Sequence, residues 1–300
     1  MPEAVLHDGS SIEVEVHGSG PVVLLPVDPR PIEGEQAEEM RKWGADPALG
    51  RSLIDGLSDA FRVVAFDYTG HLMAVPKPDT LTPDNVSADL LAVADAVGAG
   101  SFAYYGYSWL ALSGLQLALR TDRLAALAMG GYPPYEGPYA EMLKVTTATY
   151  EKAIDPPPPA TEPVEPGDWG SVQNVPSEPQ ARQFVTLYEA LQDFDDKAVR
   201  LTCPRLCFAG SADAIDYAEE WGGTRVDLAG PLTRHRGELE ARGWEVAVLD
   251  GLDHMGAMRA ENALPVLRPW LERVLLQRSQ AFSGSDRMRP MIAVVERSGR

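Results

Sequence analysis

Six short apolar runs recur along this 300-residue chain and constrain its fold more than any other feature. They are PVVLLPV, FRVVAFDY, FAYYGY, LAALAMGG, CPRLCFAG and WEVAVLDG. Continuous apolar runs of this length are typical of strands covered on both faces, as in a parallel sheet. Stretches with helical spacing lie among them, at 50–60, 82–100 and 109–120. This alternation predicts an α/β protein whose mostly parallel sheet carries helices on both faces.

The two ends of the pattern differ from its middle. IEVEVHG, at 12–18, alternates apolar and polar residues as a half-buried antiparallel strand would. ALPVLRPWLERVLLQR has the spacing of a closing helix, with its prolines near the start. The tail 278–300 is polar, and we expect it to fray or to pack late as an extra strand.

Residues 132–200 interrupt the alternation. They contain two helical pieces, and between these lies DPPPPATEPVEPGDWG, which is too rich in proline for a core element. A linker between two domains would also account for such a segment, but the strands that follow have no N-terminal strand set of their own. We therefore interpret 132–200 as a cap with a Pro-rich loop, inserted into a core formed by 1–131 and 201–277.

Charge and composition narrow the class of partner. A formal net charge of −18 argues against binding to nucleic acid, because a phosphate backbone would be repelled. No run of about 18 apolar residues occurs, so we expect no membrane span. The first residues lack the basic segment and apolar core of a secretory signal, which predicts a cytoplasmic protein. A small-molecule substrate is the expected partner, and the sequence does not indicate an oligomeric state.

The two cysteines, Cys203 and Cys207, are four residues apart in a predicted strand entry. An extended chain would hold their sulfur atoms too far apart to form a disulfide. No histidine cluster or second cysteine pair accompanies them, so a zinc site is not expected. The sequence indicates neither a metal nor an organic cofactor.

Ser108 lies where the run FAYYGY meets the helical stretch that begins at Trp109. A strand that turns directly into a helix pushes such a serine hydroxyl above the sheet edge. The backbone N–H of Trp109 is then at a helix N-terminus, where unpaired donors and the helix dipole favour an oxyanion. Gly106, two residues before the serine, relieves crowding in this turn. Ser108 is therefore the candidate nucleophile.

A histidine and an aspartate follow two later strands. His254 comes directly after WEVAVLDG, and Asp213 follows CPRLCFAG by a short turn. The carboxyl ends of parallel strands are where catalytic groups collect in such sheets. A histidine can take a proton from the serine, and the carboxylate can orient the imidazole and stabilise its charged form. Asp216, three residues after Asp213, is the alternative carboxylate.

These motifs resemble those of the α/β-hydrolase superfamily, in particular its esterase-like, haloperoxidase-like and aminopeptidase-like serine hydrolases. FRVVAFDYTGH, GYSW, CPRLCFAGSAD and GLDHMG occur in the family's order between about Glu13 and Leu276. The resemblance implies an eight-stranded sheet, a cap after the sixth strand, and a catalytic triad of Ser108, Asp213 and His254. The order Ser, Asp, His along the chain also matches this family.

Three departures from the family pattern surround the candidate site. LLPVDPRP stands where the family usually has His-Gly, so the second oxyanion donor would be the backbone N–H of Val27 or Asp28, since proline has no N–H. Leu110 replaces a small residue two positions after the serine. GHLMAVPKP replaces a loop of small residues. All three affect the site rather than the core, which indicates specialised chemistry or weakened hydrolysis.

Several side chains are candidates for a substrate pocket with hydroxyl groups for orientation. They follow predicted strand ends, where ordinary packing is the alternative interpretation. They are Tyr107, Tyr132, Tyr135 and Met255.

The main functional hypothesis is a serine hydrolase that cleaves an ester, or less readily an amide, of a small apolar substrate through an acyl-enzyme. A second hypothesis keeps the fold and assigns the Ser–His pair to proton transfer in carbon–carbon cleavage, lyase or isomerase chemistry. A third is a ligand-binding member with a degenerate site. Retention of all three triad residue types argues against the third hypothesis.

Overall fold

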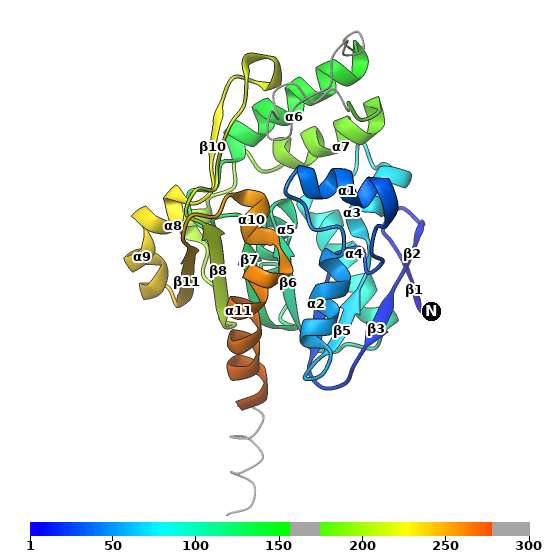
Figure 1. The fold of residues 1–300 in the computed structure, drawn as a ribbon, viewed down its shortest axis with the longest axis vertical. Coiled ribbons are helices and arrows are strands. Elements are labelled where there is room, and N and C mark those ends of the chain that lie inside the picture. Colours follow the sequence, from blue (N-terminus) through cyan, green and yellow to red (C-terminus); the bar gives the residue numbers. More distant parts are fainter. Residues whose placement is uncertain (157–174, 278–300) are drawn as a thin grey trace, which may run out of the picture.

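The computed structural model describes residues 1–156 and 175–277, in which a central sheet lies between two layers of helices (Figure 1). The predicted Pro-rich loop and C-terminal tail fall in 157–174 and 278–300, outside the described residues. The sheet and its two helical layers confirm the predicted α/β class.

The central sheet has seven strands in the order β11-β8-β7-β6-β4-β5-β3. All neighbours are parallel except the edge strand β3, which is antiparallel to β5. The strands are β3 (Glu15–His17), β4 (Val22–Leu25), β5 (Arg62–Ala65), β6 (Phe102–Tyr107), β7 (Leu124–Gly130), β8 (Arg205–Gly210) and β11 (Trp244–Leu249). The six apolar runs of the sequence therefore supply the six parallel strands.

The sheet has seven strands where the sequence analysis expected eight. β1 (Glu3–Val5) and β2 (Ser11–Glu13) pair with each other in a separate two-stranded sheet. The segment 12–18, expected as one strand, is divided at Val14, whose N–H donates to the carbonyl of Pro2 at 3.0 Å. Because the Val14 N–H is hydrogen-bonded to the N-terminal segment, only the residues after it, in β3, pair with the large sheet.

Helices cover both faces of the sheet, as expected for strands that are apolar on both sides. α2 (Leu49–Leu57) and α11 (Ala260–Leu271) pack into the core cluster on one face, and α4 (Pro83–Ala96) and α5 (Trp109–Ala118) into the cluster on the other. Each fully buried leucine in these layers contributes roughly 1.5–3 kcal/mol. The other core helices are α1 (Gly34–Lys42), α3 (Tyr68–Ala74), α8 (Gly230–Arg234), α9 (Arg236–Ala241) and α10 (His254–Met258), and α11 continues into a π-helical turn (Glu272–Leu276).

The predicted cap segment contributes two helices that pack against each other above the carboxyl edge of the sheet, α6 (Tyr139–Ile154) and α7 (Glu178–Glu189) (Figure 1). A hairpin of β9 (Ala214–Asp216) and β10 (Arg225–Asp227), which the sequence analysis did not predict, rises beside α6. The Lys152 ammonium group lies 3.7 Å from the ring centre of Trp221, next to that hairpin. The cap region is therefore built from two separate stretches of the chain, and its boundaries as a domain stay a prediction.

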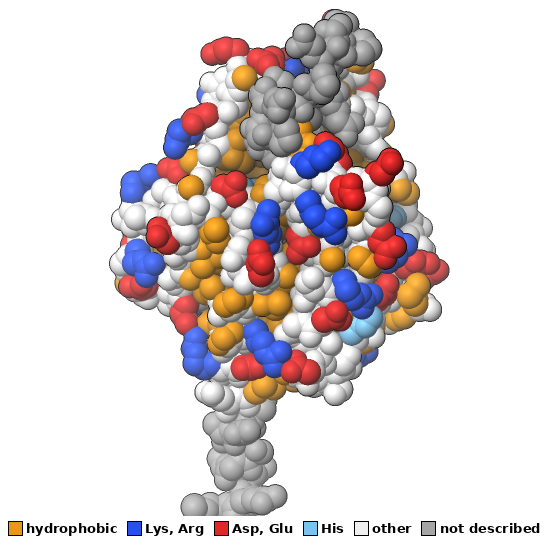
Figure 2. Space-filling model, in the orientation of Figure 1, with side chains coloured by type: hydrophobic (Ala, Val, Ile, Leu, Met, Phe, Trp, Pro, Cys, Tyr) orange, Lys and Arg blue, Asp and Glu red, His pale blue; other side chains and the backbone are white. Residues whose placement is uncertain are grey.

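The visible surface carries side chains of both charge signs. On the face drawn in Figure 2, acidic and basic side chains are interspersed, and hydrophobic side chains gather where Figure 1 places α10 and α11. Across residues 1–156 and 175–277, no helix combines the length and apolar character needed to cross a bilayer.

Candidate active site

Ser108 occupies a strained turn between β6 and α5. Its φ of 57° and ψ of −131° lie in a region that residues other than glycine rarely adopt. The residue is the N-cap of α5, yet its side chain makes no capping hydrogen bond, so the hydroxyl is not used by the helix. Its backbone N–H donates to the carbonyl of Gly130 at 2.8 Å, which anchors the turn to β7.

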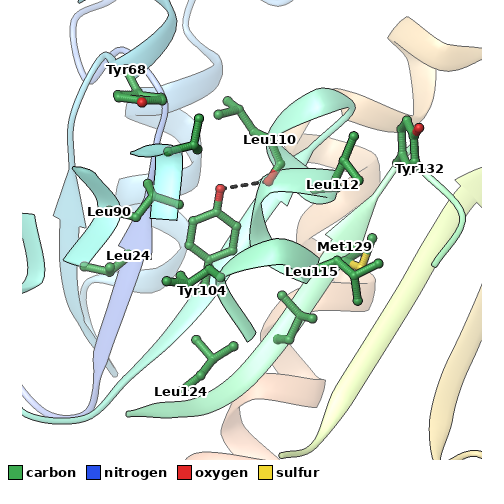
Figure 3. Close-up of a cluster of buried hydrophobic side chains, with 14 of the residues drawn as sticks. Leu24, Tyr68, Leu90, Tyr104, Leu110, Leu112, Leu115, Leu124, Met129 and Tyr132 are labelled. Carbon is green, nitrogen blue, oxygen red and sulfur yellow. Dashed lines mark hydrogen bonds between the residues drawn. The ribbon is translucent and has the colours of Figure 1, made fainter. Parts of the chain in front are cut away.

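Glycine is required two residues before the serine. A Cβ on Gly106 would come within 2.4 Å of the Leu110 carbonyl oxygen, so any larger residue would push the first turn of α5 off the strand. Leu110, the residue that departs from the family pattern, is hydrogen-bonded to the strand that precedes it. The Tyr104 hydroxyl donates to its carbonyl at 2.8 Å, and the side chains around this bond form a continuous apolar cluster (Figure 3). The elbow therefore tolerates leucine because its side chain joins the core on the α4 face.

His254 and Asp213 are in direct contact. Nδ1 of His254 lies 3.0 Å from both carboxylate oxygens of Asp213. Asp213 is 1% exposed, whereas the imidazole is partly open. A carboxylate only accepts hydrogen bonds, so Nδ1 carries a hydrogen, and in the neutral imidazole Nε2 then has a free lone pair. This is the tautomer that a general base requires.

Backbone hydrogen bonds hold the two loops that carry these residues together. The N–H of Ser211 donates to the Leu249 carbonyl at 2.8 Å, and that of Ala212 to the Leu252 carbonyl at 2.9 Å. The N–H of Gly251 donates to the Ser211 hydroxyl at 2.8 Å. A Cβ on Gly210 would come within 2.0 Å of the Leu252 carbonyl oxygen, so the loops meet only because this residue is glycine.

Tyr107 also holds His254 in place. Its hydroxyl donates to the backbone carbonyl of His254 at 2.8 Å, and its ring centre lies 5.1 Å from that of the imidazole. Burial, followed by the nearby Asp213 carboxylate, raises the pKa of Tyr107 well above its ordinary value, so the hydroxyl remains a donor. Gly130 and Gly131 make room for the ring, because a Cβ on either would lie 2.5 Å from it.

Ser108 and His254 line the same cavity, which has a volume of about 350 Å³. Within the described residues, no hydrogen bond joins the Ser108 hydroxyl to the imidazole. Catalytic hydrogen bonds are often long or misaligned before substrate binds. The arrangement therefore brings the nucleophile candidate to the base candidate without yet forming the proton-transfer contact.

The loop after β4 offers one of the two expected oxyanion donors. The N–H of Val27 donates to the Leu25 carbonyl at 2.9 Å and is already used. The N–H of Asp28 has no acceptor among the described residues and borders the cavity, as does Trp109 at the first turn of α5. The carboxylate of Asp28 turns back to accept from the Arg30 N–H at 3.0 Å. Val27 is thus removed as a donor, and Trp109 and Asp28 remain.

The helix α2 presses against this same loop. A Cβ on Gly50 would come within 1.9 Å of the Asp28 carbonyl oxygen and 3.2 Å of the Val27 side chain. The close approach restrains the position of the loop at the cavity. The position of the Asp28 N–H is therefore set partly by α2.

The indole of Trp109 is packed between the core and the cap. It stacks on Tyr68 with ring centres 6.0 Å apart, and the edge of Phe184 from α7 lies 5.4 Å away. Tyr68 is itself fixed, because its hydroxyl donates at 2.8 Å to Asp89, a fully buried carboxylate. The chain of contacts restrains the residue whose N–H is an oxyanion donor candidate.

The other predicted site residues are divided between the cavity and the cap. Tyr107 and Met255 line the cavity with Ser108, but Tyr132 and Tyr135 do not. The ring of Tyr132 lies 6.1 Å from that of Tyr139 in the cap, and the ring of Tyr135 lies 4.9 Å from the imidazole of His235.

Asp216, the alternative carboxylate, lies in β9 and pairs with Arg225 at 2.6 Å. It is in no contact with His254 within the described residues, so Asp213 is the carboxylate that orients the histidine.

Most of the apolar cavity wall was not predicted from the sequence. Apolar spacing in the segment 50–60 indicated that α2 is buried, but it could not indicate that two of its leucines border a cavity as well as the core. The missed lining residues include Leu25, Leu49, Leu53, Tyr105 and Met258.

Comparison with known proteins gives structural matches only. No protein family and no curated protein sequence matches the chain. Among solved structures, it is similar to a thermophilic esterase from Thermogutta terrifontis, with 17% identity, a TM-score of 0.57, and coverage of 91% of this chain and 98% of that one. It is also similar to an enol-lactonase from Burkholderia xenovorans LB400, with 18% identity, a TM-score of 0.57, and coverage of 90% of this chain and 99% of that one. A third match is the epoxide hydrolase VrEH1 from Vigna radiata, with 16% identity, a TM-score of 0.55, and coverage of 90% of this chain and 97% of that one. At these identities the similarity establishes a shared fold.

Proposed function

We propose, from the premise that this chain has the α/β-hydrolase fold, that it is a serine hydrolase that cleaves an ester of a small apolar substrate, and an amide less readily. Ser108 is the nucleophile, His254 the general base and acid, and Asp213 the residue that orients the histidine. The observation that carries the proposal is the contact of Nδ1 of His254 with both Asp213 oxygens at 3.0 Å, beside a cavity that Ser108 also lines.

The reaction follows from the positions of these groups. Nε2 of His254 takes the proton of the Ser108 hydroxyl as its oxygen attacks the carbonyl carbon of the ester. The negative charge that develops on the carbonyl oxygen is stabilised by the N–H groups of Trp109 and Asp28. His254 then gives its proton to the departing alkoxide, and water releases the acyl group from Ser108 by the same steps. Substrate binding has to bring the hydroxyl and Nε2 into hydrogen-bond contact first.

The cavity favours an uncharged acyl group. Most of its lining is aliphatic or aromatic, and the described residues that form it include neither lysine nor arginine. An anionic group would lose its hydration there without gaining a counterion, which is costly. The net charge of −18 adds a general repulsion of anions.

Covalent labelling by a fluorophosphonate probe tests the assignment of the nucleophile. We expect the intact protein to be labelled and to hydrolyse 4-nitrophenyl esters, and Ser108→Ala to lose both properties. Ser87→Ala is the matched control, because Ser87 is a buried helical serine whose hydroxyl donates to the Pro83 carbonyl in α4. An unlabelled wild-type protein would contradict the proposal. Labelling of Ser108 without turnover of any ester would instead support non-hydrolytic chemistry at the same site.

A further inference from the structure

The cavity at Ser108 extends along the face of the sheet that α2 and α10 cover, and the described part of the cap does not line it. Leu25 of β4 and Tyr105 of β6 lie deep along this face, in the same core cluster. Leu53 of α2 and Met258 of α10 add further walls. A group attached to the carbonyl carbon at Ser108 therefore has a path toward the core between α2 and α10, past the first turn of α5.

Tyr105 carries the unusual polar atom of this path. Its side chain is 2% exposed and stacks on Phe208 with ring centres 6.0 Å apart. Its hydroxyl makes no hydrogen bond with any described residue, in contrast to Tyr104 and Tyr107 on the same strand, which both donate to carbonyls. The hydroxyl is not among the buried unpaired polar atoms of the described residues, so it keeps some accessible surface. Because Tyr105 lines the cavity, a molecule bound there can supply the acceptor that this hydroxyl lacks.

The cavity also limits what that partner can be. Among the described residues that line it, Asp28 is the only acidic one, and no lysine or arginine is present to neutralise a carboxylate or phosphate. The partner is therefore an uncharged oxygen. A cavity of about 150 Å³ holds one benzene molecule, so the 350 Å³ here accommodates roughly twice as many carbon atoms.

We propose that Tyr105 determines substrate specificity by donating a hydrogen bond to an uncharged ether, hydroxyl or carbonyl oxygen within the acyl chain of the ester. The inference rests on the proposed function, because it places the acyl carbonyl at Ser108. Tyr105 precedes Ser108 by three strand residues, which is roughly 10 Å along the strand. The oxygen is therefore distant from the ester bond, and the preferred substrates are oxygenated acyl esters of medium length.

Pairs of 4-nitrophenyl esters with acyl chains of equal length test this proposal. One member of each pair has only methylene groups, and the other has an ether oxygen at one position, which is moved along the chain. We expect wild-type kcat/KM to be about ten-fold higher for the ether at one position, since a site built around a hydrogen bond discriminates against analogues that lack it. In Tyr105→Phe this ratio should fall to about one, because the phenyl ring keeps the cavity wall but has no hydroxyl to donate.

Two further variants locate the acyl chain. Leu53→Trp should shorten the longest chain accepted, and the control Leu143→Trp, on α6 in a separate groove of the cap, should leave it unchanged.

No preference for any ether in the wild type, or the same preference in Tyr105→Phe, would overturn the inference even if esters are cleaved. The wild-type comparison does not depend on the folding of a variant. Failure to cleave any ester would contradict the proposed function itself.

Discussion

Replacing Asp213 by asparagine tests the catalytic role of the Asp213–His254 contact. In the proposed mechanism, His254 becomes positively charged beside a buried carboxylate, with both oxygens 3.0 Å from Nδ1. Two unit charges about 4 Å apart interact by about 4 kcal/mol at an effective dielectric constant of about 20. Loss of that attraction corresponds to about three powers of ten in rate. The amide also favours the wrong imidazole tautomer, so we expect kcat to fall by about 10⁴ in total.

The assay is steady-state hydrolysis of a 4-nitrophenyl ester, with Tm measured to show that the variant is folded. Asp216→Asn is the matched control, because Asp216 is 71% exposed and pairs with Arg225 rather than with His254. Its kcat should stay within about two-fold of the wild-type value, as expected for an exposed ion pair. A folded Asp213→Asn protein that keeps more than a tenth of the wild-type kcat would refute the reasoning.

Two further predictions concern the support of the site and of the fold. Tyr107→Phe removes the hydrogen bond to the His254 carbonyl, so it should lower kcat several-fold with little change in KM. It should also lower the free energy of unfolding, measured in urea, by about 1 kcal/mol. An unchanged kcat would refute a positioning role. Asp8 is subject to burial, which raises its pKa, but hydrogen bonds from Lys77 and Ser10 outweigh this and hold the pKa well below its ordinary value. The stability that Asp8 contributes is therefore present above about pH 4 and lost as the pH falls through its lowered folded-state pKa. Asp8→Asn removes the 2.8 Å partner of the buried Lys77 and leaves Asp89, at 3.5 Å, as its remaining carboxylate. It should cost about 1–2 kcal/mol at pH 7 in urea unfolding, and less at pH 3 and below; a cost independent of pH would contradict this.

The approach of Ser108, Asp213 and His254 to one edge was predictable because each follows a recognisable strand. In a parallel sheet, the carboxyl ends of all strands lie on the same edge. Once FAYYGY, CPRLCFAG and WEVAVLDG are read as parallel strands, the residues that follow them must lie on one side of the sheet. The contact between Asp213 and His254 then needs only short loops, and Gly210 permits them.

The second oxyanion donor could not be chosen from the sequence. Val27 and Asp28 are adjacent, both carry an N–H, and both lie between prolines. The choice depends on a tight turn in which the Leu25 carbonyl accepts from Val27, a local geometry that no residue pattern here specifies.

The β9–β10 hairpin and the cavity wall escaped prediction for different physical reasons. The hairpin strands have three residues each, which is too short for a detectable alternation of apolar and polar residues. Leu53 and Tyr105 are apolar or aromatic in elements correctly expected to be buried. Periodicity identifies the buried face of a helix or strand, but it does not distinguish a side chain that fills the core from one that borders a cavity.

The close approach of Gly50 to Asp28 has a consequence for changing the proposed activity by directed evolution. α2 supplies Leu53 to the acyl path and also supports the loop with the oxyanion donor candidate. A substitution that shifts this helix to admit a new substrate would also move the Asp28 N–H. A change in selectivity obtained in this way should therefore be accompanied by a lower kcat. The glycine of α10, Gly256, faces Asp253 and Leu252 rather than that loop. Libraries aimed at Met255 and Met258 should therefore separate the two properties better than libraries in the first turn of α2.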